Sequence, residues 1–437
     1  MESNPNPCWR SLTLNELTLD TPITYGVVKP GINGSIPFIR GGDISNGQVD
    51  VNQLRTISEA VSQQYGRTLL RGGELVVSLV GNPGQVAKVP AELAGANIAR
   101  QVALVRINED TDSDFVKYYL SSSLGQMSLS GYTMGSVQQV INLRDLKKIK
   151  IPVPPLPEQK AIAHILGSLD DKIELNRRMN ATLEGMAQAL FKSWFVDFDP
   201  VIDNALAAGN PIPEELAERA EVRRKALADG TANREVGRPF SDAFQRTDEM
   251  GWIPVGWEVK KAESIVDRMK VNQKFTKKNV LVSGNIPVFD QGTGLLLGFH
   301  NGLADVESSK MNPSFIFGDH TCITHLSIKP FSVGPNVIPL KAKNYDPYWT
   351  YFAIKDIQPF QEYRRHWMEF KIKEVLVPSE ELASIFGNFI GDLYISMESN
   401  TDESTSLAKL RDTLLPKLIS GELRIPETEK LTKEALA

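Results

Sequence analysis

Long apolar runs, a secretory signal and cysteine pairs are all missing from this sequence. No run of about eighteen apolar residues occurs, which argues against a transmembrane helix. The first ten residues, MESNPNPCWR, lack the basic and apolar parts of a secretory signal. Cys8 and Cys322 are the only cysteines, which excludes a disulfide framework and is typical of a reducing compartment. We therefore expect a cytoplasmic protein with no membrane partner.

The motifs of nucleic-acid enzymes are absent or incomplete. There is no Gly-Lys-Ser/Thr phosphate loop, which excludes a translocase. A DNA adenine methyltransferase needs an Asn/Asp-Pro-Pro-aromatic motif, and residues 346–349 (DPYW) lack one proline. It also needs a glycine-rich methyl-donor loop, and residues 289–294 (FDQGTG) have the wrong glycine spacing. We interpret both stretches as turns. Residues 369–371 (EFK) could be half of a nuclease site, but no matching acidic residue precedes them.

One group of side chains has the composition of a metal site. His320, Cys322 and His325 lie close together in the sequence. On a strand, His320 and Cys322 would share a face, whereas His325 would point the other way. No second group of ligands accompanies them. We therefore expect no metal, no cofactor and no catalytic residue, and the sequence favours a recognition protein.

The small excess of acidic residues, 53 against 48 basic ones, is confined to one segment. Residues 197–251 carry 12 acidic and 7 basic side chains, a net charge of −5 that equals that of the whole chain. We interpret residues 198–250 as an acidic connector with a short charged helix over about residues 213–228. A disordered linker is the alternative.

A long heptad pattern follows a proline-rich step in the middle of the chain. Residues 152–157 (PVPPLP) cannot be helical, but Pro157 suits the first turn of a helix. From Ile162 the seam positions alternate in steps of four and three, as in a coiled coil. The helix would be on the order of 55 Å long, so it needs a partner helix. The seam residues are Ile162, Leu166, Leu169, Ile173, Asn176, Asn180, Leu183, Ala187, Leu190 and Trp194.

A second copy of this segment begins 224 residues later, without a gap. Its seam is weaker because Ser404 and Arg411 occupy two positions, and Pro416 should fray or kink the last turn. Asn176 and Asn400 share one seam position, where a polar residue can set register and strand orientation; solvated asparagines are the alternative. The second seam comprises Phe386, Ile390, Leu393, Met397, Asn400, Ser404, Leu407, Arg411, Leu414 and Leu418.

The segments before the two helices repeat each other loosely. Both are rich in turn signals and short apolar runs typical of strands, and residues 34–38 (GSIPF) correspond to residues 284–288 (GNIPV). We predict a mixed domain over residues 1–150, a long helix over 151–197 and the connector over 198–250. A second mixed domain over 251–376, a second long helix over 377–425 and a tail over 426–437 follow.

Four stretches carry a family resemblance that extends over essentially the whole chain. Residues 151–162 have the pattern I-P-x-P-P-L-x-E-Q-x-x-I, and residues 190–200 the pattern L-F-x-S-W-F-x-D-F-x-P. Together with residues 36–45 (IPFIRGGDIS) and 251–259 (GWIPVGWEV), they resemble the specificity subunit of type I restriction–modification systems. The second proline step, residues 377–379 (VPS), keeps only one proline, which weakens the start signal of the second helix.

The resemblance implies an α+β fold in which two mixed α/β target-recognition domains in tandem are separated by two long helices that pair as an antiparallel coiled coil. It also implies a non-catalytic subunit that recognises double-stranded DNA, with each domain reading one half of a bipartite sequence. The implied partners are two modification (methyltransferase) subunits and further restriction (motor–nuclease) subunits. A methyltransferase or a fused restriction enzyme with divergent motifs is the alternative, and a coiled-coil scaffold without DNA binding is a third interpretation.

Candidate DNA contacts are side chains that can neutralise phosphates or reach base edges. Arginine suits guanine, asparagine and glutamine suit adenine, and an aromatic ring can stack or act as a wedge. Solvated surface positions are the alternative for each residue. The candidates in the first domain are Arg40, Arg100, Gln101, Tyr132, Gln138, Gln139 and Asn142. Those in the second domain are Lys274, Lys277, Lys278, His320, Arg364, Arg365, His366 and Trp367.

The aromatic end of the first long helix needs a separate explanation. Phe195 and Phe198 lie beside the seam, and Trp194 ends it. A seam buries one stripe only, so apolar residues outside it need another contact. We expect this end to contact a modification subunit or to seal the junction with the second domain.

Overall fold

The chain folds into two compact units in the computed structural model, which describes residues 9–19, 23–31, 33–45, 47–52, 54–131, 133–134, 140–231, 237–292, 294–423 and 425–436. Unit 1 comprises Met1–Asn176 and Glu403–Ala437, and unit 2 comprises Arg177–Asp402. Each unit therefore contains one mixed α/β region and a segment of each long helix.

Unit 1 is built on a central antiparallel sheet with the strand order β2-β10-β7-β8. Strands β7 and β10 are rich in valine and leucine and are buried at every position. A second sheet, β6-β3-β9, contains one parallel pair, and β1 pairs with β13. The strands are β1 (Arg10–Thr13), β2 (Thr24–Tyr25), β3 (Ile36–Ile39), β6 (Arg55–Ile57), β7 (Leu75–Ser78), β8 (Val86–Lys88), β9 (Asn97–Ile98), β10 (Val102–Val105) and β13 (Lys150–Val153).

Short helices and hairpins complete this region. Helix α2 covers the central sheet with Phe115 and Val116, which are fully buried in the same core as β7 and β10. The elements are β4 (Ile44–Ser45), β5 (Gln48–Val49), α1 (Glu59–Gln64), α2 (Ser113–Ser121), α3 (Ser123–Ser130), β11 (Thr133–Met134), β12 (Val140–Ile141), α4 (Leu143–Leu146), and the 3₁₀ turns η1 (Gly41–Asp43), η2 (Gly66–Thr68) and η3 (Ala91–Leu93).

Unit 2 repeats the three sheets of unit 1 strand for strand. Its central sheet has the order β17-β23-β20-β21, its second sheet β19-β18-β22 again contains one parallel pair, and β16 pairs with β24. The loose sequence repeat thus encodes the same topology twice. The strands are β16 (Glu258–Lys261), β17 (Val266–Arg268), β18 (Ile286–Phe289), β19 (Leu296–His300), β20 (Ser314–Gly318), β21 (Thr324–Ser327), β22 (Ser332–Val333), β23 (Val337–Ala342) and β24 (Glu374–Val377).

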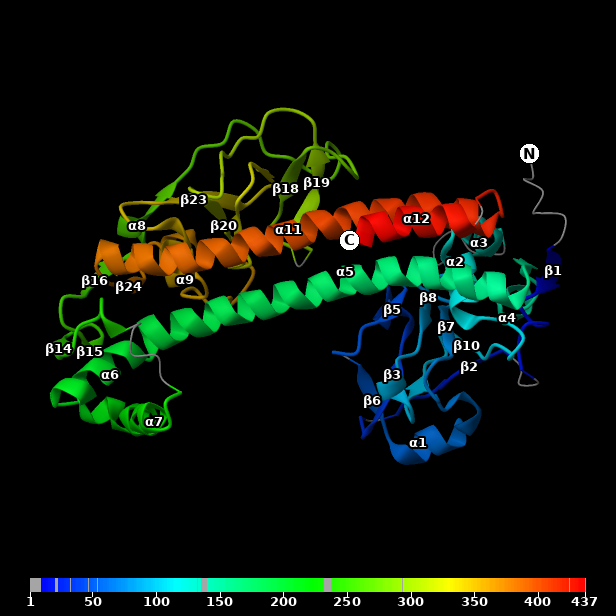
Figure 1. Ribbon diagram of the computed structural model, residues 1–437, viewed down its shortest axis with the longest axis horizontal. Helices are drawn as coiled ribbons and strands as arrows, with labels where there is room; N and C mark the ends of the chain where they lie inside the picture. Colours follow the sequence, from blue (N-terminus) through cyan, green and yellow to red (C-terminus); the bar gives the residue numbers. More distant parts are fainter. Residues whose placement is uncertain are drawn as a thin grey trace. The chain divides into compact units, whose positions relative to one another are not determined.

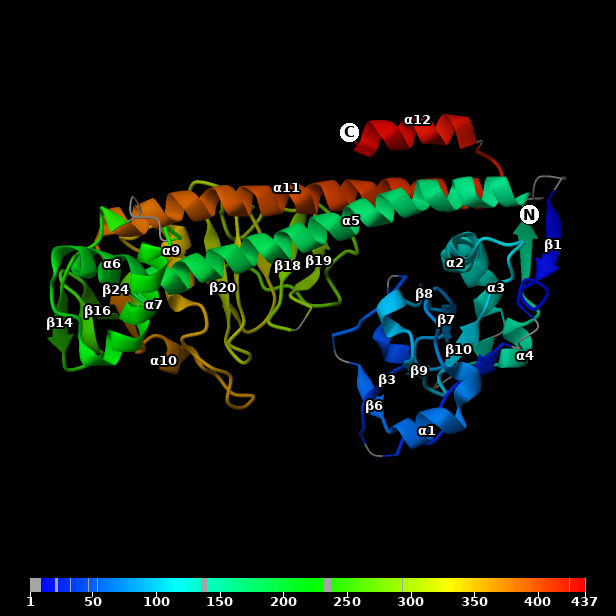
Figure 2. The ribbon, with the colours of Figure 1, turned by 60° about the horizontal axis from the view of Figure 1, so that its bottom comes forward.

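The remaining elements of this region include the counterparts of α2 and α4. Helix α9 is apolar all round and packs in the core with β20 and β23, as α2 does in unit 1. Figure 2 shows α9 and β20 beside α11. The elements are the hairpin strands β14 (Phe244–Thr247) and β15 (Gly251–Pro254), and the helices α8 (Ala262–Ile265), α9 (Pro347–Ile354) and α10 (Trp367–Phe370).

The two predicted long helices are present as α5 (Leu156–Phe191) and α11 (Glu380–Ile419). The offset of 224 residues holds for the start of both helices and also for β13 with β24 and α4 with α10. The Ser379 hydroxyl accepts a hydrogen bond from the Leu382 N–H at 3.2 Å, which caps α11 where only one proline remains. Helix α11 continues through Pro416 to Ile419.

None of the described helices is both long and apolar enough to cross a membrane.

The predicted seam is present, because all of its residues are buried or half-buried. In unit 1, Asn176 Nδ2 donates to Glu403 Oε2 at 2.7 Å, and Arg411 Nη1 donates to Asp170 Oδ1 at 2.7 Å. Rising numbers in α5 thus face falling numbers in α11, which confirms antiparallel pairing. Arg411, a weak seam position in the sequence, is accommodated by this ion pair. Figure 1 shows the unit 1 sheet strands beside the N-terminal part of α5.

In unit 2 the same antiparallel pairing continues with a polar network. Asn400 Nδ2 donates to Asn180 Oδ1 at 2.8 Å, and Asn180 Nδ2 donates to the Met397 carbonyl at 3.0 Å. Glu184 of α5 accepts from the Tyr394 hydroxyl of α11 at 3.2 Å and from Lys355 Nζ at 2.5 Å. The seam asparagines therefore form hydrogen bonds from one helix to the other. Such bonds are what a polar seam residue needs in order to set the register of the pair.

The acidic connector contains two helices where the sequence predicted one. After a π-helical turn, η4 (Lys192–Val196), come α6 (Asp199–Ala208), η5 (Glu214–Leu216) and α7 (Ala217–Ala228). Arg219 binds Asp199 with two bonds of 2.6 and 2.7 Å, and Arg223 binds Asp203 one helical turn further on. Burial raises the pKa of Asp199, but its hydrogen bonds to Arg219 and Ser193 outweigh burial and leave that pKa below its usual value.

The C-terminal helix α12 (Ile425–Leu436) belongs to unit 1. Gly421 has a φ of 73°, the left-handed conformation that lets the chain turn after α11. Figure 2 shows α12 folding back beside the end of α11. Leu423, Ala435 and Leu436 pack against the unit 1 core.

The aromatic end of α5 is part of the unit 2 core. Trp194, Phe195 and Phe198 are only 4%, 5% and 8% exposed. The Phe195 ring lies 5.2 Å from the ring of Phe386 and 5.6 Å from that of Trp257. Of the two expected roles, the structure supports sealing the junction with the second domain.

We predict that Phe195→Ala destabilises the free protein. Removing a buried phenyl ring costs about 3–5 kcal/mol through lost transfer energy and a residual cavity. Val196→Ala is the matched control, because Val196 is the next residue and is 55% exposed. Denaturant unfolding should show a lower midpoint for Phe195→Ala alone. Equal midpoints for the two variants would contradict the core assignment.

We also predict acid-dependent stability from Glu184. Burial raises its pKa, but bonds to Lys355, Gln188 and Tyr394 outweigh burial and hold the pKa below its usual value. A lowered folded-state pKa stabilises the protein above the unfolded-state pKa of about 4.3, and this stability is lost as the pH falls through the folded-state pKa. Glu184→Gln should therefore lower stability at pH 7 and flatten its decline on acidification.

The measurement is the free energy of unfolding from pH 7 down through the acidic limb. Glu221→Gln is the control, since Glu221 is exposed on α7 and its ion-pair partner among the described residues is the exposed Arg224 of the same helix. An unchanged acid limb in Glu184→Gln would count against the role of this network.

Candidate DNA-recognition surfaces

Four loops converge at one edge of the central sheet in unit 1. The Leu79 N–H donates to the Gln101 carbonyl at 2.7 Å, which joins the loop after β7 to the loop before β10. The Ile141 N–H donates to the Leu79 carbonyl at 3.0 Å, which adds the segment before α4. The loop after β3 completes the group, because a Cβ added at Gly41 would lie 2.9 Å from Ser78 Oγ and 3.7 Å from Gln101 Cβ. A side chain here would press on the Ser78 hydroxyl and the Val80 carbonyl, so glycine suits this close approach.

The structure brings the described candidates of the first domain to this edge. Arg100 and Gln101 are exposed on the loop before β10, and Asn142 is exposed at the N-cap position of α4. Arg40 is different, because its guanidinium binds Asp43 through Nη2–Oδ1 at 2.7 Å and Nε–Oδ2 at 3.1 Å. Tyr132, Gln138 and Gln139 lie outside the described residues.

The same loops converge in unit 2. The Asp319 N–H donates to the Asn336 carbonyl at 2.8 Å, which joins the loop after β20 to the loop before β23. The His366 N–H donates to the Asp319 carbonyl at 2.8 Å, which adds the segment before α10. Gln291, after β18, reaches the same place, and its Oε1 accepts from the His320 N–H at 2.9 Å.

The candidates of the second domain divide into exposed and buried residues. Arg365 is 80% exposed, whereas Arg364 is held in ion pairs with Glu362 and Glu369. His366 is fully buried and binds the Glu362 carbonyl at 3.0 Å, so we leave it out of the proposed contact surface. Trp367 is half-buried, and the Arg268 guanidinium lies 5.7 Å from its ring centre. His320 is half-buried, with its ring 4.8 Å from that of Tyr363.

A basic stretch borders this surface. Residues 268–289 contain five basic and no acidic side chains. Lys277 and Lys278 are exposed in it, and Lys274 Nζ donates to the Val337 carbonyl at 3.0 Å. Burial and the nearby Arg268 charge lower the pKa of Lys274. The stretch is therefore suited to an anionic ligand.

The His320, Cys322 and His325 group does not gather around one point. The described residues include no cluster of three or more His, Cys, Asp or Glu side chains able to hold a metal ion. His325 packs edge-on against Phe289 at 4.7 Å, and burial lowers its pKa to about 4. Burial also raises the pKa of the Cys322 thiol to about 11, which disfavours a thiolate.

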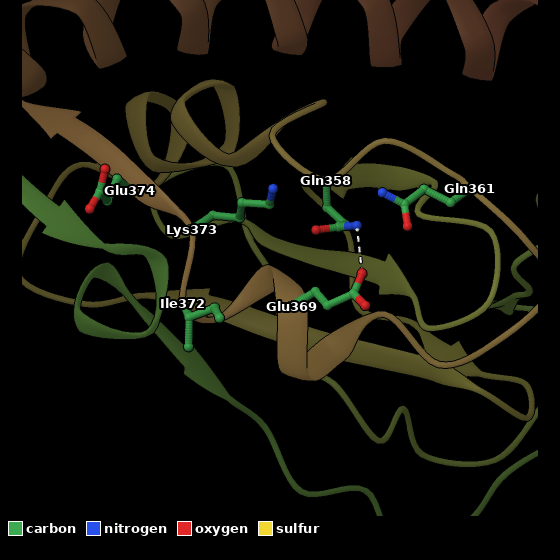
Figure 3. A pocket seen from close by; sticks show the side chains of 6 residues that line it. All are labelled: Gln358, Gln361, Glu369, Ile372, Lys373 and Glu374. Atoms are coloured by element: carbon green, nitrogen blue, oxygen red, sulfur yellow. Dashed lines mark hydrogen bonds between the residues drawn. The ribbon is translucent and has the colours of Figure 1, made fainter. Parts of the chain in front are cut away.

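A pocket of about 400 Å³ lies beside α10 in unit 2 (Figure 3). Gln358 Nε2 donates to Glu369 Oε2 at 3.1 Å within it, as Figure 3 shows. With two acidic residues and one lysine, its lining is poorly suited to a phosphate. The lining residues are Gln358, Gln361, Glu369, Ile372, Lys373 and Glu374.

Sequence reasoning missed the residues that hold the exposed candidates in place. Asp319, Gln291 and Arg268 were not predicted, and Asp319 and Gln291 are nearly buried. The candidates were chosen as side chains that attract phosphate or bind base edges. An acidic residue such as Asp319 repels phosphate and is therefore not selected in this way. By its hydrogen bonds Asp319 takes the place that Leu79 has in unit 1, because each N–H donates to the loop before the neighbouring strand and each carbonyl accepts from the segment before the next short helix.

The fold and these surfaces define a tandem recognition protein, with two equivalent domains and a different set of side chains on each. Comparison with known proteins agrees with this class. Residues 30–185 match the family model described as "Type I restriction modification DNA specificity domain".

Two relatives extend over nearly the whole chain. The MjaIX specificity subunit of Methanocaldococcus jannaschii is 23% identical over 425 residues, which cover 93% of this chain and 90% of the relative. The HindI specificity subunit of Haemophilus influenzae is 23% identical over 442 residues, covering 89% and 94%. The EcoBI specificity subunit of Escherichia coli is 32% identical over 231 residues, 48% of each chain.

A solved structure is similar as well. The S subunit of a type I restriction–modification system from M. genitalium aligns with 96% of this chain and 97% of its own, with 18% identity and a TM-score of 0.49. The relatives agree with the resemblance noted in the sequence: over nearly its whole length the chain is similar to specificity subunits of type I restriction enzymes.

Proposed function

We propose that this chain is the DNA sequence-recognition subunit of a type I restriction–modification complex and reads a bipartite target with one half-site per domain. The observation that carries the proposal is the duplicated domain. The three sheets recur strand for strand, while the loops at the same edge present different side chains. A shared scaffold with different loops is expected when two domains bind the same kind of ligand with different specificity.

Affinity and specificity would come from different side chains of these surfaces. Lys274, Lys277 and Lys278 would contact phosphates, which position the domain without reading sequence. Arg100 and Gln101 in the first domain, and His320 and Arg365 in the second, would reach base edges. Trp367 is half-buried, and its ring would hold the Arg268 guanidinium in place at this surface through their 5.7 Å contact.

The proposed complex supplies the chemistry through other subunits. Two modification subunits would methylate DNA and restriction subunits would translocate and cleave it, while this chain positions them on the target without catalysis. One of the two candidate methyltransferase stretches, residues 346–349, supports this division. Asp346 is the N-cap of α9, where its Oδ1 accepts from the Tyr348 and Trp349 N–H groups, and so it has a structural role.

Co-expression with a modification subunit of the same type I system tests the proposal. We predict that long-read sequencing of host DNA will show methylation at one bipartite motif with two short specified halves. Omitting this chain is the control and should abolish the motif. The purified chain alone should transfer no tritiated methyl groups to genomic DNA. Methylation by the lone chain would support the methyltransferase alternative, and no dependence on the chain would support a scaffold.

We further predict that Lys277→Ala/Lys278→Ala weakens DNA binding without changing the motif. Each lysine–phosphate contact contributes roughly one counterion, so the slope of log K against log salt should fall by about two. Arg224→Ala/Lys225→Ala, on α7 of the connector, removes the same charge away from the proposed surface. Fluorescence anisotropy of the complex on duplex DNA at several salt concentrations measures the slope. An altered motif or an unchanged slope would contradict the phosphate role.

A further inference from the structure

An arm and a turn are joined by one carboxylate in unit 2. The arm is residues 362–367, before and at the start of α10, and the turn is residues 318–323, between β20 and β21. Asp319 Oδ1 accepts from the His366 N–H at 3.1 Å and from the Trp367 N–H at 3.0 Å. The Asp319 carbonyl also accepts from the His366 N–H at 2.8 Å. Asp319 is 9% exposed, so water competes little for these bonds.

The buried side of the arm is held by further contacts. The His366 ring is fully buried, with Nε2 bonded to the Glu362 carbonyl at 3.0 Å and Nδ1 lying 3.3 Å from Glu369 Oε2. Phe317 and Phe370 pack beneath, with ring centres 4.6 Å apart. The arm backbone is therefore anchored on both sides of Arg365.

The turn at residues 318–323 contains a strained backbone and unpaired polar atoms. Cys322 has a φ of 59°, a left-handed conformation that costs energy for a residue with a side chain. Gln291 holds the His320 N–H, and the buried atoms His320 Nδ1 and Thr321 Oγ1 have no hydrogen-bond partner among the described residues. Such unpaired groups and local strain concentrate where a ligand binds.

The two arginines of the arm differ in their availability. The Arg364 side chain is 42% exposed and makes ion pairs with both Glu362 and Glu369. The Arg365 side chain is 80% exposed, and the carboxylate that approaches it among the described residues is that of Asp319, with Nε 3.9 Å from Oδ2. That separation is too long for a hydrogen bond, so the guanidinium of Arg365 keeps its paired donors for a ligand.

We propose that Asp319 is a positioning residue that aims Arg365 at a guanine in the half-site read by the second domain. This inference rests on the proposed function and adds which residue reads which base. Asp319 fixes the arm backbone on both sides of the Arg365–His366 peptide through its Oδ1 and its carbonyl, while its Oδ2 lies 3.9 Å from Arg365 Nε and leaves the guanidinium donors unoccupied. The planar guanidinium then matches the O6 and N7 acceptors that guanine presents in the major groove. The adjacent Tyr363, 72% exposed, flanks this contact.

The test uses the co-expressed complex and the methylated motif in host DNA. Arg365→Ala and Arg365→Lys should each relax one G·C position in the second half, with a loss of discrimination of about five- to hundredfold. Lysine keeps the charge but not the paired donors, so a phosphate contact would survive in Arg365→Lys. Unchanged specificity in Arg365→Lys would overturn the guanine assignment.

Two variants of Asp319 separate positioning from simple stability. Asp319→Ala should relax the same position as Arg365→Ala and leave the first half unchanged. Asp319→Asn keeps an acceptor oxygen for the two N–H groups, so it should restore most of the discrimination. Thermal unfolding of each free variant is the companion measurement.

The outcomes distinguish this inference from the proposed function. A bipartite motif that stays intact in Asp319→Ala would overturn the positioning role alone. Loss of methylation at both halves, with a lowered melting temperature in both Asp319 variants, would assign Asp319 a structural role only and overturn the inference. A chain whose presence has no effect on methylation would overturn the proposed function itself. Arg246→Ala, on the β14–β15 hairpin, is the charge-matched control and should leave the motif unchanged.

Discussion

The antiparallel pairing of α5 and α11 is the interaction on which both units depend. In unit 1, the core formed by β7, β10 and α2 is completed by Ile162 and Leu166 of α5 and by Leu414 of α11. In unit 2, the core of β20, β23 and α9 is completed by Phe195, beyond the end of α5, and by Phe386 and Ile390 of α11. Neither mixed region buries its apolar surface without both helices.

This arrangement links distant parts of the chain. Unit 1 contains the first 176 residues and the segment from Glu403 onward, so its core closes only after the intervening residues have folded or been looped out. Closing such a long loop costs entropy that grows slowly with length, so a well-packed helix pair can offset it. The polar bonds of Asn176, Asn180 and Asn400 add directional contacts to an otherwise apolar stripe, which favours one register over its neighbours.

The duplicated sheets separate scaffold from specificity. Buried strands such as β7 and β20 occupy equivalent places and carry different sequences, LVVS and SFIFG, that satisfy the same demand for apolar side chains. At the sheet edge the two units need different residues at equivalent positions. Gly41 of unit 1 corresponds to Gln291 of unit 2. Where unit 1 needs the close approach of a glycine, unit 2 uses a side-chain amide to hold the next loop. Equivalent backbones thus present unlike surfaces.

Sequence alone determined the features that depend on local periodicity and on self-similarity. The heptad steps, the proline start signals and the 224-residue offset predicted α5, α11 and their partnership, because helix contacts repeat at fixed intervals along the chain. The family resemblance supplied the antiparallel direction of the helices and the recognition role. The site could be predicted only as groups of basic, amide and aromatic residues.

Tertiary structure alone decided how those groups meet and which of them are accessible. It buried His366, exposed Arg365 beside it, and placed Trp194, Phe195 and Phe198 in a core. It also joined Asp319 to an arm 47 residues away in sequence. These outcomes depend on contacts between segments far apart in the chain, where burial and hydrogen-bond partners are set by neighbours that no local pattern records.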